Sequence, residues 1–326
     1  MKFKHAFHVL VDNFSVTYKQ LLYRLVIYIV AALIAWGILT PFIRDFINSE
    51  ALNDLLTNVK TFIWDFLSGN VLSLEPVSKN IIEAYDQLIH LFQTRISEIV
   101  LTGLLLLTLL IVEKWLTGLG NYTTAVIIND KMLLRTTSPF IRTLISHFKE
   151  AALFNLIYVP LSVLYDLIVA AGLFVTLFFM IRGIQFFFVS VFIFALIMVL
   201  AIAIKMTFTC DWLPALIRGK MGQRKSIKYA FSQKNKKTFN VFSNFVVILI
   251  MILAVNLLAL FFTFGVGLLL VLPASYVIII SFEMVNYYDR EELRYFLDKN
   301  TIIKPEKELT LTREQFFKGA DNNEKP

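Results

Sequence analysis

Six stretches of mostly apolar residues are separated by polar segments along the chain. A helix needs about 20 apolar residues to cross a hydrocarbon core of roughly 30 Å, so each stretch predicts one membrane-spanning helix. The last two stretches are separated by Phe264-Gly265-Val266-Gly267, which predicts a tight turn. A β-barrel is excluded because barrel strands alternate apolar and polar residues and these stretches do not. The predicted spans are 21–40, 96–116, one within 151–181, 184–204, and two within 241–282.

Two prolines bear on the limits of these spans. Pro41 directly follows the first span and predicts its end. Pro160 lies in the third apolar segment, which is longer than one straight span needs. It therefore predicts either a kink or a first turn that lies at the membrane surface.

Composition agrees with a membrane protein and excludes several other classes. The 326 residues are 57% hydrophobic and 17% charged, whereas soluble domains have about a quarter of their residues charged. The chain has 31 Phe and a single cysteine, Cys210. A disordered chain, a disulfide scaffold and an ordinary soluble enzyme are therefore excluded.

The polar segments carry charges that predict an orientation. Segment 42–98 has a net charge of −4, whereas segments 1–20, 113–150 and 205–240 have net charges of +2, +2 and +8. Basic loops stay on the cytoplasmic side of a membrane. We therefore expect a multi-pass protein of the cell membrane, with both termini cytoplasmic and segment 42–98 outside.

An amphipathic segment precedes each pair of spans. One apolar face of each segment would lie in the membrane interface, with basic residues toward the headgroups. This pattern predicts three copies of an interfacial helix followed by a hairpin of spans. The faces are Phe3, Phe7, Leu10, Val11 and Phe14; Ile141, Leu144, Ile145 and Phe148; and Ile227, Phe231 and Phe239.

One sequence passage adds a family resemblance to this pattern. Gly222–Ser232 reads GQRKSIKYAFS and is followed by a Lys/Asn-rich stretch and a Phe-rich span. With six spans and three interfacial helices, the chain resembles a bacterial family of six-span integral membrane domains. Some members of that family are fused to glycerophosphoryl diester phosphodiesterases. The resemblance covers about residues 1–290, implies a membrane module without the catalytic domain, and transfers no active site.

The acidic loop of residues 42–95 is itself patterned. Apolar residues at helical spacing predict one helix over 50–67, with Ser49 as its N-cap, and a second helix over 79–93. We expect these two helices to form an extracellular cap between spans 1 and 2. The cap is either a structural lid over the bundle or a site for a basic partner.

Ionisable and polar groups inside the spans are the candidate site. Asp166 lies near the middle of the third span beside Tyr165, and Asn256 lies in the fifth span. Charged groups at that depth are costly and often functional. Three interpretations stay open for Asp166: a proton or cation site, a packing residue hydrogen-bonded to Asn256, or a residue that faces water. Arg24 and Glu283 lie near predicted cytoplasmic ends of spans, where long side chains reach the interface at little cost.

The most basic loop is the second candidate. Its residues either set the topology by lying against anionic headgroups or bind a specific lipid or partner protein. No stacking motif or recognised fold accompanies the charge, so we expect no nucleic-acid binding. The patch comprises Arg218, Lys220, Arg224, Lys225, Lys228, Lys234, Lys236 and Lys237.

No cofactor or metal motif is visible in the sequence. His5, His8 and Asp12 share a helical face, which we interpret as a solvated interfacial face. Residues 291–326 predict a polar cytoplasmic tail, and its first residues, through Arg294, predict an extension of the last helix.

Two functional hypotheses follow. The first is a non-enzymatic membrane module, acting as a scaffold or accessory subunit or engaging anionic inner-leaflet lipids. The alternative is a small-solute or ion transporter or channel with a polar path near Asp166 and Asn256.

Overall fold

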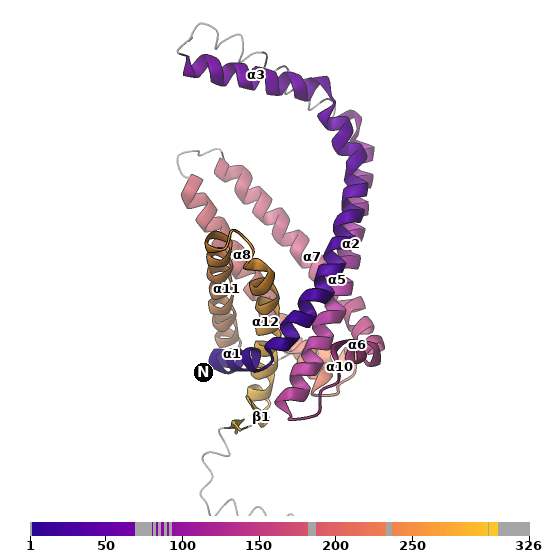
Figure 1. The fold of residues 1–326 in the computed structure, drawn as a ribbon, viewed down its shortest axis with the longest axis vertical. Helices are drawn as coiled ribbons and strands as arrows, with labels where there is room; N and C mark the ends of the chain where they lie inside the picture. Colours follow the sequence, from indigo (N-terminus) through magenta and orange to yellow (C-terminus); the bar gives the residue numbers. More distant parts are fainter. Residues whose placement is uncertain are drawn as a thin grey trace, which may run out of the picture. The chain divides into compact units, whose positions relative to one another are not determined.

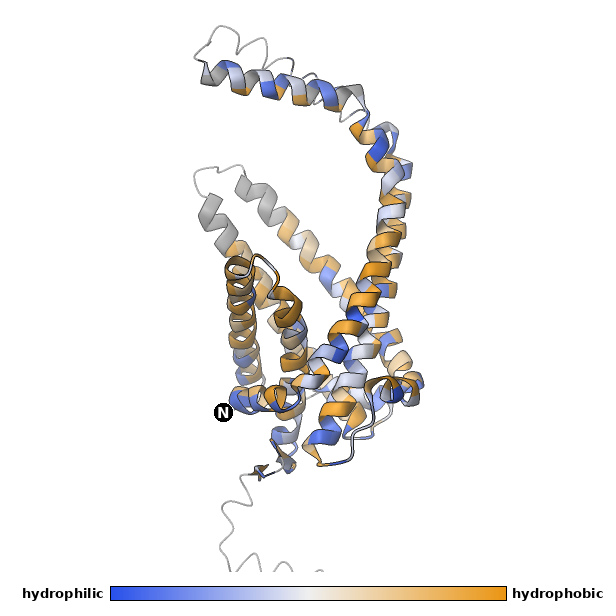
Figure 2. Ribbon diagram, in the orientation of Figure 1, coloured by the Kyte–Doolittle hydropathy of each residue, from blue (hydrophilic) through white to orange (hydrophobic). Residues whose placement is uncertain are grey.

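A computed structural model describes residues 2–68, 93–181, 187–232, 237–298 and 300–305, and the single positions 80, 83, 86, 87 and 90. In this part of the chain, six helices are long and apolar enough to cross a membrane, so the protein is a multi-pass membrane protein by length and composition. Long apolar stretches are visible in these helices (Figure 2). They are α2 (Phe14–Ile47), α5 (Ile96–Met132), α7 (Phe148–Ile181), α8 (Phe187–Thr209), α11 (Lys237–Phe262) and α12 (Leu268–Arg290) (Figure 1).

Shorter elements lie before or between these helices. Helices α1, α6 and α10 each precede two of the long helices in the chain. The other elements are α3, α9 and two strands. The bounds are α1 (Lys2–Asp12), α3 (Glu50–Leu67), α6 (Phe140–Ser146), α9 (Trp212–Ile217), α10 (Gln223–Ser232), β1 (Tyr295–Phe296) and β2 (Ile302–Ile303).

The chain forms two compact units. Unit 1 comprises residues 1–25 and 115–326, and unit 2 comprises residues 26–114. Helices α2 and α5 therefore each contribute one part to both units. In unit 2, Arg95 Nη1 lies 2.6 Å from Asp45 Oδ2, so an ion pair joins the C-terminal part of α2 to the residue before α5.

The buried core of unit 1 lies at one end, which we call the basal end. Helices α1, α6 and α10, the end of α12 and the two strands lie at this end (Figure 1). Aromatic side chains fill it: the Trp212 ring packs edge-on against Phe154 and Tyr158, with centroids 5.3 and 5.8 Å away. Toward the other end, apolar side chains are mostly exposed, as lipid-facing side chains would be.

Several predicted boundaries are wrong. Helix α2 does not end before Pro41 but contains it, and the Thr40 hydroxyl donates to the Trp36 carbonyl in the turn that the proline interrupts. Helix α5 continues 16 residues past the predicted end of its span, to Met132. Residues 117–129 are rich in Gly, Thr and Asn, too polar to predict a span, yet most of them are buried in the basal core.

The predicted turn near Gly265 is confirmed. Phe264 and Gly265 both have positive φ angles, and the reversal joins α11 to α12. Helices α11 and α12 lie side by side (Figure 1). The first helix of the acidic loop is also present, and the Leu52 N–H donates to Ser49 Oγ at 3.3 Å, as expected for an N-cap. The second predicted helix, 79–93, lies largely outside the described residues.

The segment after α12 differs from the prediction. The helix ends at Arg290 instead of extending through Arg294, because Glu292 adopts a positive φ and the Leu293 N–H turns back to the Tyr288 carbonyl. This is a Schellman-type helix end. Strands β1 and β2 then pair antiparallel, with Tyr295 opposite Ile303. Tyr295 is 2% exposed, so the start of the predicted tail belongs to the core of unit 1.

Candidate functional site

Asp166 forms an ion pair that the sequence prediction missed. Lys205 Nζ lies 2.7 Å from Asp166 Oδ1, which joins α8 to α7. The predicted fourth span stops one residue before Lys205, whereas α8 continues to Thr209 and carries the lysine within the helix. The side chains of Lys205 and Asp166 are 18% and 39% exposed, so the lysine is the more enclosed partner.

Tyr165 belongs to the same polar site. Its hydroxyl donates to the Ala201 carbonyl of α8 at 2.8 Å, and Lys205 Nζ lies 6.0 Å from the centre of its ring. Ala201 and Lys205 are one helical turn apart, so Tyr165 and Asp166 contact α8 at successive turns. The α7–α8 pair thus brings together a carboxylate, an ammonium group and a phenol.

Asn256 makes different contacts from those predicted. Its Nδ2 donates to the Ile252 carbonyl at 2.7 Å and to Ser275 Oγ at 3.4 Å. These bonds lie within α11 and between α11 and α12. The predicted pairing of Asp166 with Asn256 is therefore replaced by two separate polar contacts, because each residue finds its partner within its own pair of helices.

The basic patch is partly described. Arg224, Lys225 and Lys228 are exposed on α10, and the Arg218 guanidinium lies 5.5 Å from the centre of the Tyr288 ring. Lys220 follows α9 with φ of 47°, and Lys237 is the first residue of α11. Lys234 and Lys236 lie outside the described residues.

Arg24 does not reach the interface as predicted, since it is 5% exposed within unit 1. Its Nη2 donates to Asn121 Oδ1 at 2.7 Å, and its guanidinium lies 3.5 Å from the centre of the Tyr276 ring. Arg24 thereby connects α2, α5 and α12. In the sequence, the polar segment of α5 that contains Asn121 is the signal that could have predicted a buried partner for Arg24. The hydrophobicity pattern does not show which helix packs against that segment.

An ion pair that is more enclosed than Asp166–Lys205 joins Arg290 of α12 to Asp211, the residue before α9. Arg290 Nη2 also donates to the Tyr229 hydroxyl of α10 at 3.2 Å, and that hydroxyl donates in turn to Glu291. Burial, together with the hydrogen bond to Glu291, raises the pKa of the Tyr229 phenol, which stays protonated. This network fixes α10 to the end of α12.

His5 contacts a part-buried protein group, so the expectation of a solvated face is wrong for His5, whereas the His8 side chain is 49% exposed beside Asp298. His5 Nδ1 lies 2.8 Å from the Tyr295 hydroxyl, and His8 Nε2 lies 3.0 Å from Asp298 Oδ2. Burial lowers the pKa of His5. The two histidines therefore join α1 to the β1–β2 hairpin.

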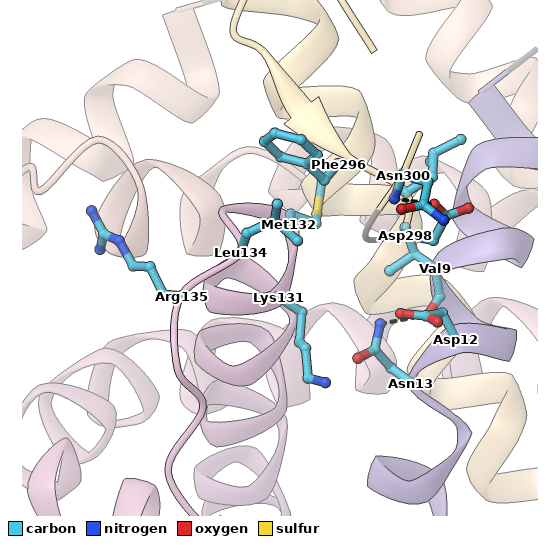
Figure 3. A pocket seen from close by; sticks show the side chains of 11 residues that line it. Val9, Asp12, Asn13, Lys131, Met132, Leu134, Arg135, Phe296, Asp298 and Asn300 are labelled. Atoms are coloured by element: carbon cyan, nitrogen blue, oxygen red, sulfur yellow. Dashed lines mark hydrogen bonds between the residues drawn. The ribbon is translucent and has the colours of Figure 1, made fainter. Parts of the chain in front are cut away.

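Two cavities open at the basal end. The first, of about 370 Å³, lies between α1, the end of α5 and the hairpin. Figure 3 shows that Arg135, one of its lining residues, points away from it. Asp298, on another wall, accepts hydrogen bonds from the Asn300 and Thr301 backbone N–H groups, so its carboxylate is engaged in the hairpin turn.

The second cavity, of about 580 Å³, lies between α5, the start of α7 and the loop that joins α9 to α10. Its wall carries charges of both signs and one histidine. The charged groups and the histidine are Asp130, Arg135, His147, Glu150 and Lys220. This cavity brings one predicted patch residue, Lys220, together with groups that the sequence prediction did not single out.

No family model matches the chain, and no curated protein or solved structure matches it either.

Proposed function

We propose that the protein is a non-enzymatic module of the cell membrane that engages anionic phospholipids through the basic face of α10. The observation that carries this proposal is the exposure of Arg224, Lys225 and Lys228 on a helix whose opposite side is buried. Ser226 and Ala230 supply that buried side. Residues three and four apart share one face of a helix, so the three cations form one cluster.

The orientation belongs to the same proposal. The lysine- and arginine-rich segment 205–240 lies next to spanning helices, and basic loops remain cytoplasmic. Both chain termini and α10 are then cytoplasmic, and α1, α6 and α10 lie in the inner interface. The exposed Ile141 and Ile145 of α6 supply apolar contacts for such a placement. The resemblance to the six-span domain family is consistent with this assignment.

The expected strength follows from the number of cations. A basic residue near an anionic membrane surface contributes about 1 kcal/mol, and a tenfold change in affinity corresponds to about 1.4 kcal/mol. Three residues therefore account for a preference of roughly 100-fold for anionic over neutral lipid. The preference falls as salt is raised, because ions screen exposed charges.

Lipid titration of the purified full-length chain tests the proposal. A triple variant, Arg224→Gln/Lys225→Gln/Lys228→Gln, is expected to lose most of the preference for phosphatidylglycerol over phosphatidylcholine. Lys60→Gln on α3, outside the basic loop, serves as the control. An unchanged lipid preference, together with unchanged recovery of partner proteins from native membranes, would lead us to abandon the proposal.

A second candidate function is transport, and the ion pair between Asp166 and Lys205 is the observation that favours it. Intramembrane ionisable pairs commonly mark ion or proton paths. In proteoliposomes, Asp166→Asn is expected to abolish flux of protons or small cations if the pair forms such a path. Flux that persists unchanged in this variant removes the main reason for the transport hypothesis.

A further inference from the structure

We propose that the 580 Å³ cavity binds the headgroup of one phospholipid that carries both a phosphodiester and a primary ammonium group. This inference deepens the proposed lipid-engaging function and rests on its placement of α6 and the start of α7 at the membrane surface. It concerns a different set of side chains from the α10 cluster.

The charge of the cavity wall matches a zwitterion. Arg135 and Lys220 balance Asp130 and Glu150, so the wall is formally neutral when His147 is neutral. An anionic headgroup would leave the two carboxylates without a cation. A headgroup with both charges offers its phosphate to the two cations and its ammonium to the two carboxylates. The cavity volume lies within the range of roughly 300–1,000 Å³ that small-molecule sites have.

The two cations are held by helix ends. Leu134 adopts φ of 53°, and the Arg135 N–H donates to the Asp130 carbonyl at 2.8 Å, which fixes the backbone at Arg135. Lys220 also has a positive φ, a conformation that costs free energy for a residue with a Cβ. The fold therefore sets the backbone positions from which the Arg135 and Lys220 side chains extend.

The Glu150 carboxylate is oriented by two neighbours. The Tyr122 hydroxyl donates to Glu150 Oε2 at 3.2 Å, and His147 Nδ1 lies 3.2 Å from the same oxygen. Tyr122 is 2% exposed, whereas the Glu150 side chain is 63% exposed. The carboxylate is thus held from behind by a buried phenol while remaining accessible to an ammonium group.

An apolar path leads from the cavity along α7. Leu153 lines the cavity, and four further residues continue at helical spacing on the same helix. All five side chains are more than a third exposed, and none is charged, so the stripe suits an acyl chain. The stripe comprises Leu153, Ile157, Leu161, Leu164 and Ile168. The charged cavity and the stripe together fit an intact lipid better than a soluble headgroup.

Equilibrium titration of the full-length chain in detergent, with lipids that carry a fluorescent acyl chain, tests the proposal. The titration uses the α10 triple variant Arg224→Gln/Lys225→Gln/Lys228→Gln, so that the α10 cluster contributes no preference for phosphatidylglycerol. Phosphatidylethanolamine is expected to bind at least tenfold more tightly than phosphatidylcholine, whose ammonium has no N–H, or phosphatidylglycerol, which has no amine. Equal binding of the three lipids, or a preference for phosphatidylglycerol, would overturn the proposal. Glycerophosphoethanolamine that binds as tightly as the lipid would overturn the lipid assignment.

Three variants distinguish the cavity from the rest of the surface. Glu150→Gln is expected to remove the preference for phosphatidylethanolamine over phosphatidylcholine. Arg135→Gln is expected to lower the affinity for both lipids about tenfold. Arg142→Gln, an exposed α6 residue that does not line the cavity, is the matched control and should bind like the parent. The melting temperature of each variant verifies that it folds. Arg135 is exposed, so we expect its substitution to leave the fold intact. Unaltered binding in both cavity variants would refute the site.

The α10 triple variant separates this inference from the proposed function. It should lose the preference for anionic lipid but keep the binding of phosphatidylethanolamine. If the cavity variants have no effect while the α10 variant does, only the inference about the cavity fails.

Discussion

Lys205 of α8 and Asp166 of α7 form an ion pair whose Nζ–Oδ1 distance is 2.7 Å, within helices that are otherwise almost entirely apolar. A charged group in the bilayer interior costs about 2.5–3.5 kcal/mol on insertion scales. Because each charge offsets the cost of the other, the pair holds the two helices together while keeping polar groups at membrane depth.

Replacing one charged side chain of the pair should therefore lower the free energy of unfolding more than replacing both. We expect Lys205→Met to lower the free energy of unfolding in mixed micelles by about 2–3 kcal/mol, because it leaves an uncompensated carboxylate. The double variant Lys205→Met/Asp166→Leu should recover most of that loss. A double-mutant cycle measures the coupling, and strictly additive effects would show that the pair does not stabilise the helices.

Close packing of α5 on α7 gives a second prediction. A Cβ at Gly118 would lie 2.1 Å from Asn155 Oδ1, and Asn155 is 1% exposed. Gly118→Ala should therefore destabilise the protein by about 1–3 kcal/mol through overpacking.

Gly103 on the same helix provides the control. A Cβ there meets nothing within 4 Å, so Gly103→Ala should stabilise α5 by about 0.5–1 kcal/mol. Thermal melting of the two variants in one detergent should therefore move in opposite directions. Stabilisation by both substitutions would show that α5 and α7 do not approach closely at Gly118.

The end of α5 gives a third prediction. Leu134 has φ of 53°, is 49% exposed and occupies the position where helices prefer glycine. Leu134→Gly should raise the free energy of unfolding by about 1 kcal/mol, because glycine adopts this conformation without the steric cost. Leu133→Gly, one residue earlier, should lower it. A destabilising Leu134→Gly would contradict the helix end described above.

A large part of the fold is predictable from the sequence. The spans, the turn near Gly265 and the helix capped by Ser49 follow from local patterns of apolar and turn residues. The buried extension of α5 was missed because a helix packed inside protein needs no continuous apolar stretch. The β1–β2 hairpin was missed because each strand has only two residues and depends on Tyr295 packing in the core.

The candidate site was predictable only in part. Asp166 is visible in the sequence as a charge inside an apolar stretch, but its partner depends on which helices pair and on the register between them. Lys205 falls at the edge of a span, where a lysine usually reaches the interface. Likewise, Arg135, Glu150 and Lys220 come from three separate segments that only the fold brings to one cavity.

The contact between α1 and the hairpin should depend on pH. The pKa of His5 lies below its usual value of 6.5 because of burial, so the folded state disfavours the protonated ring. As pH falls through about 6.5, His5 binds a proton more readily when α1 is detached from the hairpin than when α1 is docked on it. Docking of α1 therefore weakens. The pKa of Asp298 is also lowered, chiefly by the Asn300 backbone N–H, so protonation of Asp298 at still lower pH weakens the hairpin turn itself.

Hydrogen–deuterium exchange of residues 2–12 measures this docking. We expect less protection at pH 5.5 than at pH 7.5, after correction for the intrinsic exchange rate. In His5→Gln the difference between the two pH values should shrink, since glutamine does not titrate. Equal protection at both pH values in the parent chain would contradict the role of His5.

The central claim is that the chain crosses the membrane six times with α10 in the cytoplasm and α3 outside. In a background without Cys210, which is 1% exposed, single cysteines are placed at Lys60 on α3 and Lys225 on α10. A membrane-impermeant thiol reagent applied to intact cells should label Lys60→Cys at once and Lys225→Cys only after the cells are permeabilised. Labelling of Lys225→Cys but not of Lys60→Cys in intact cells would contradict the account.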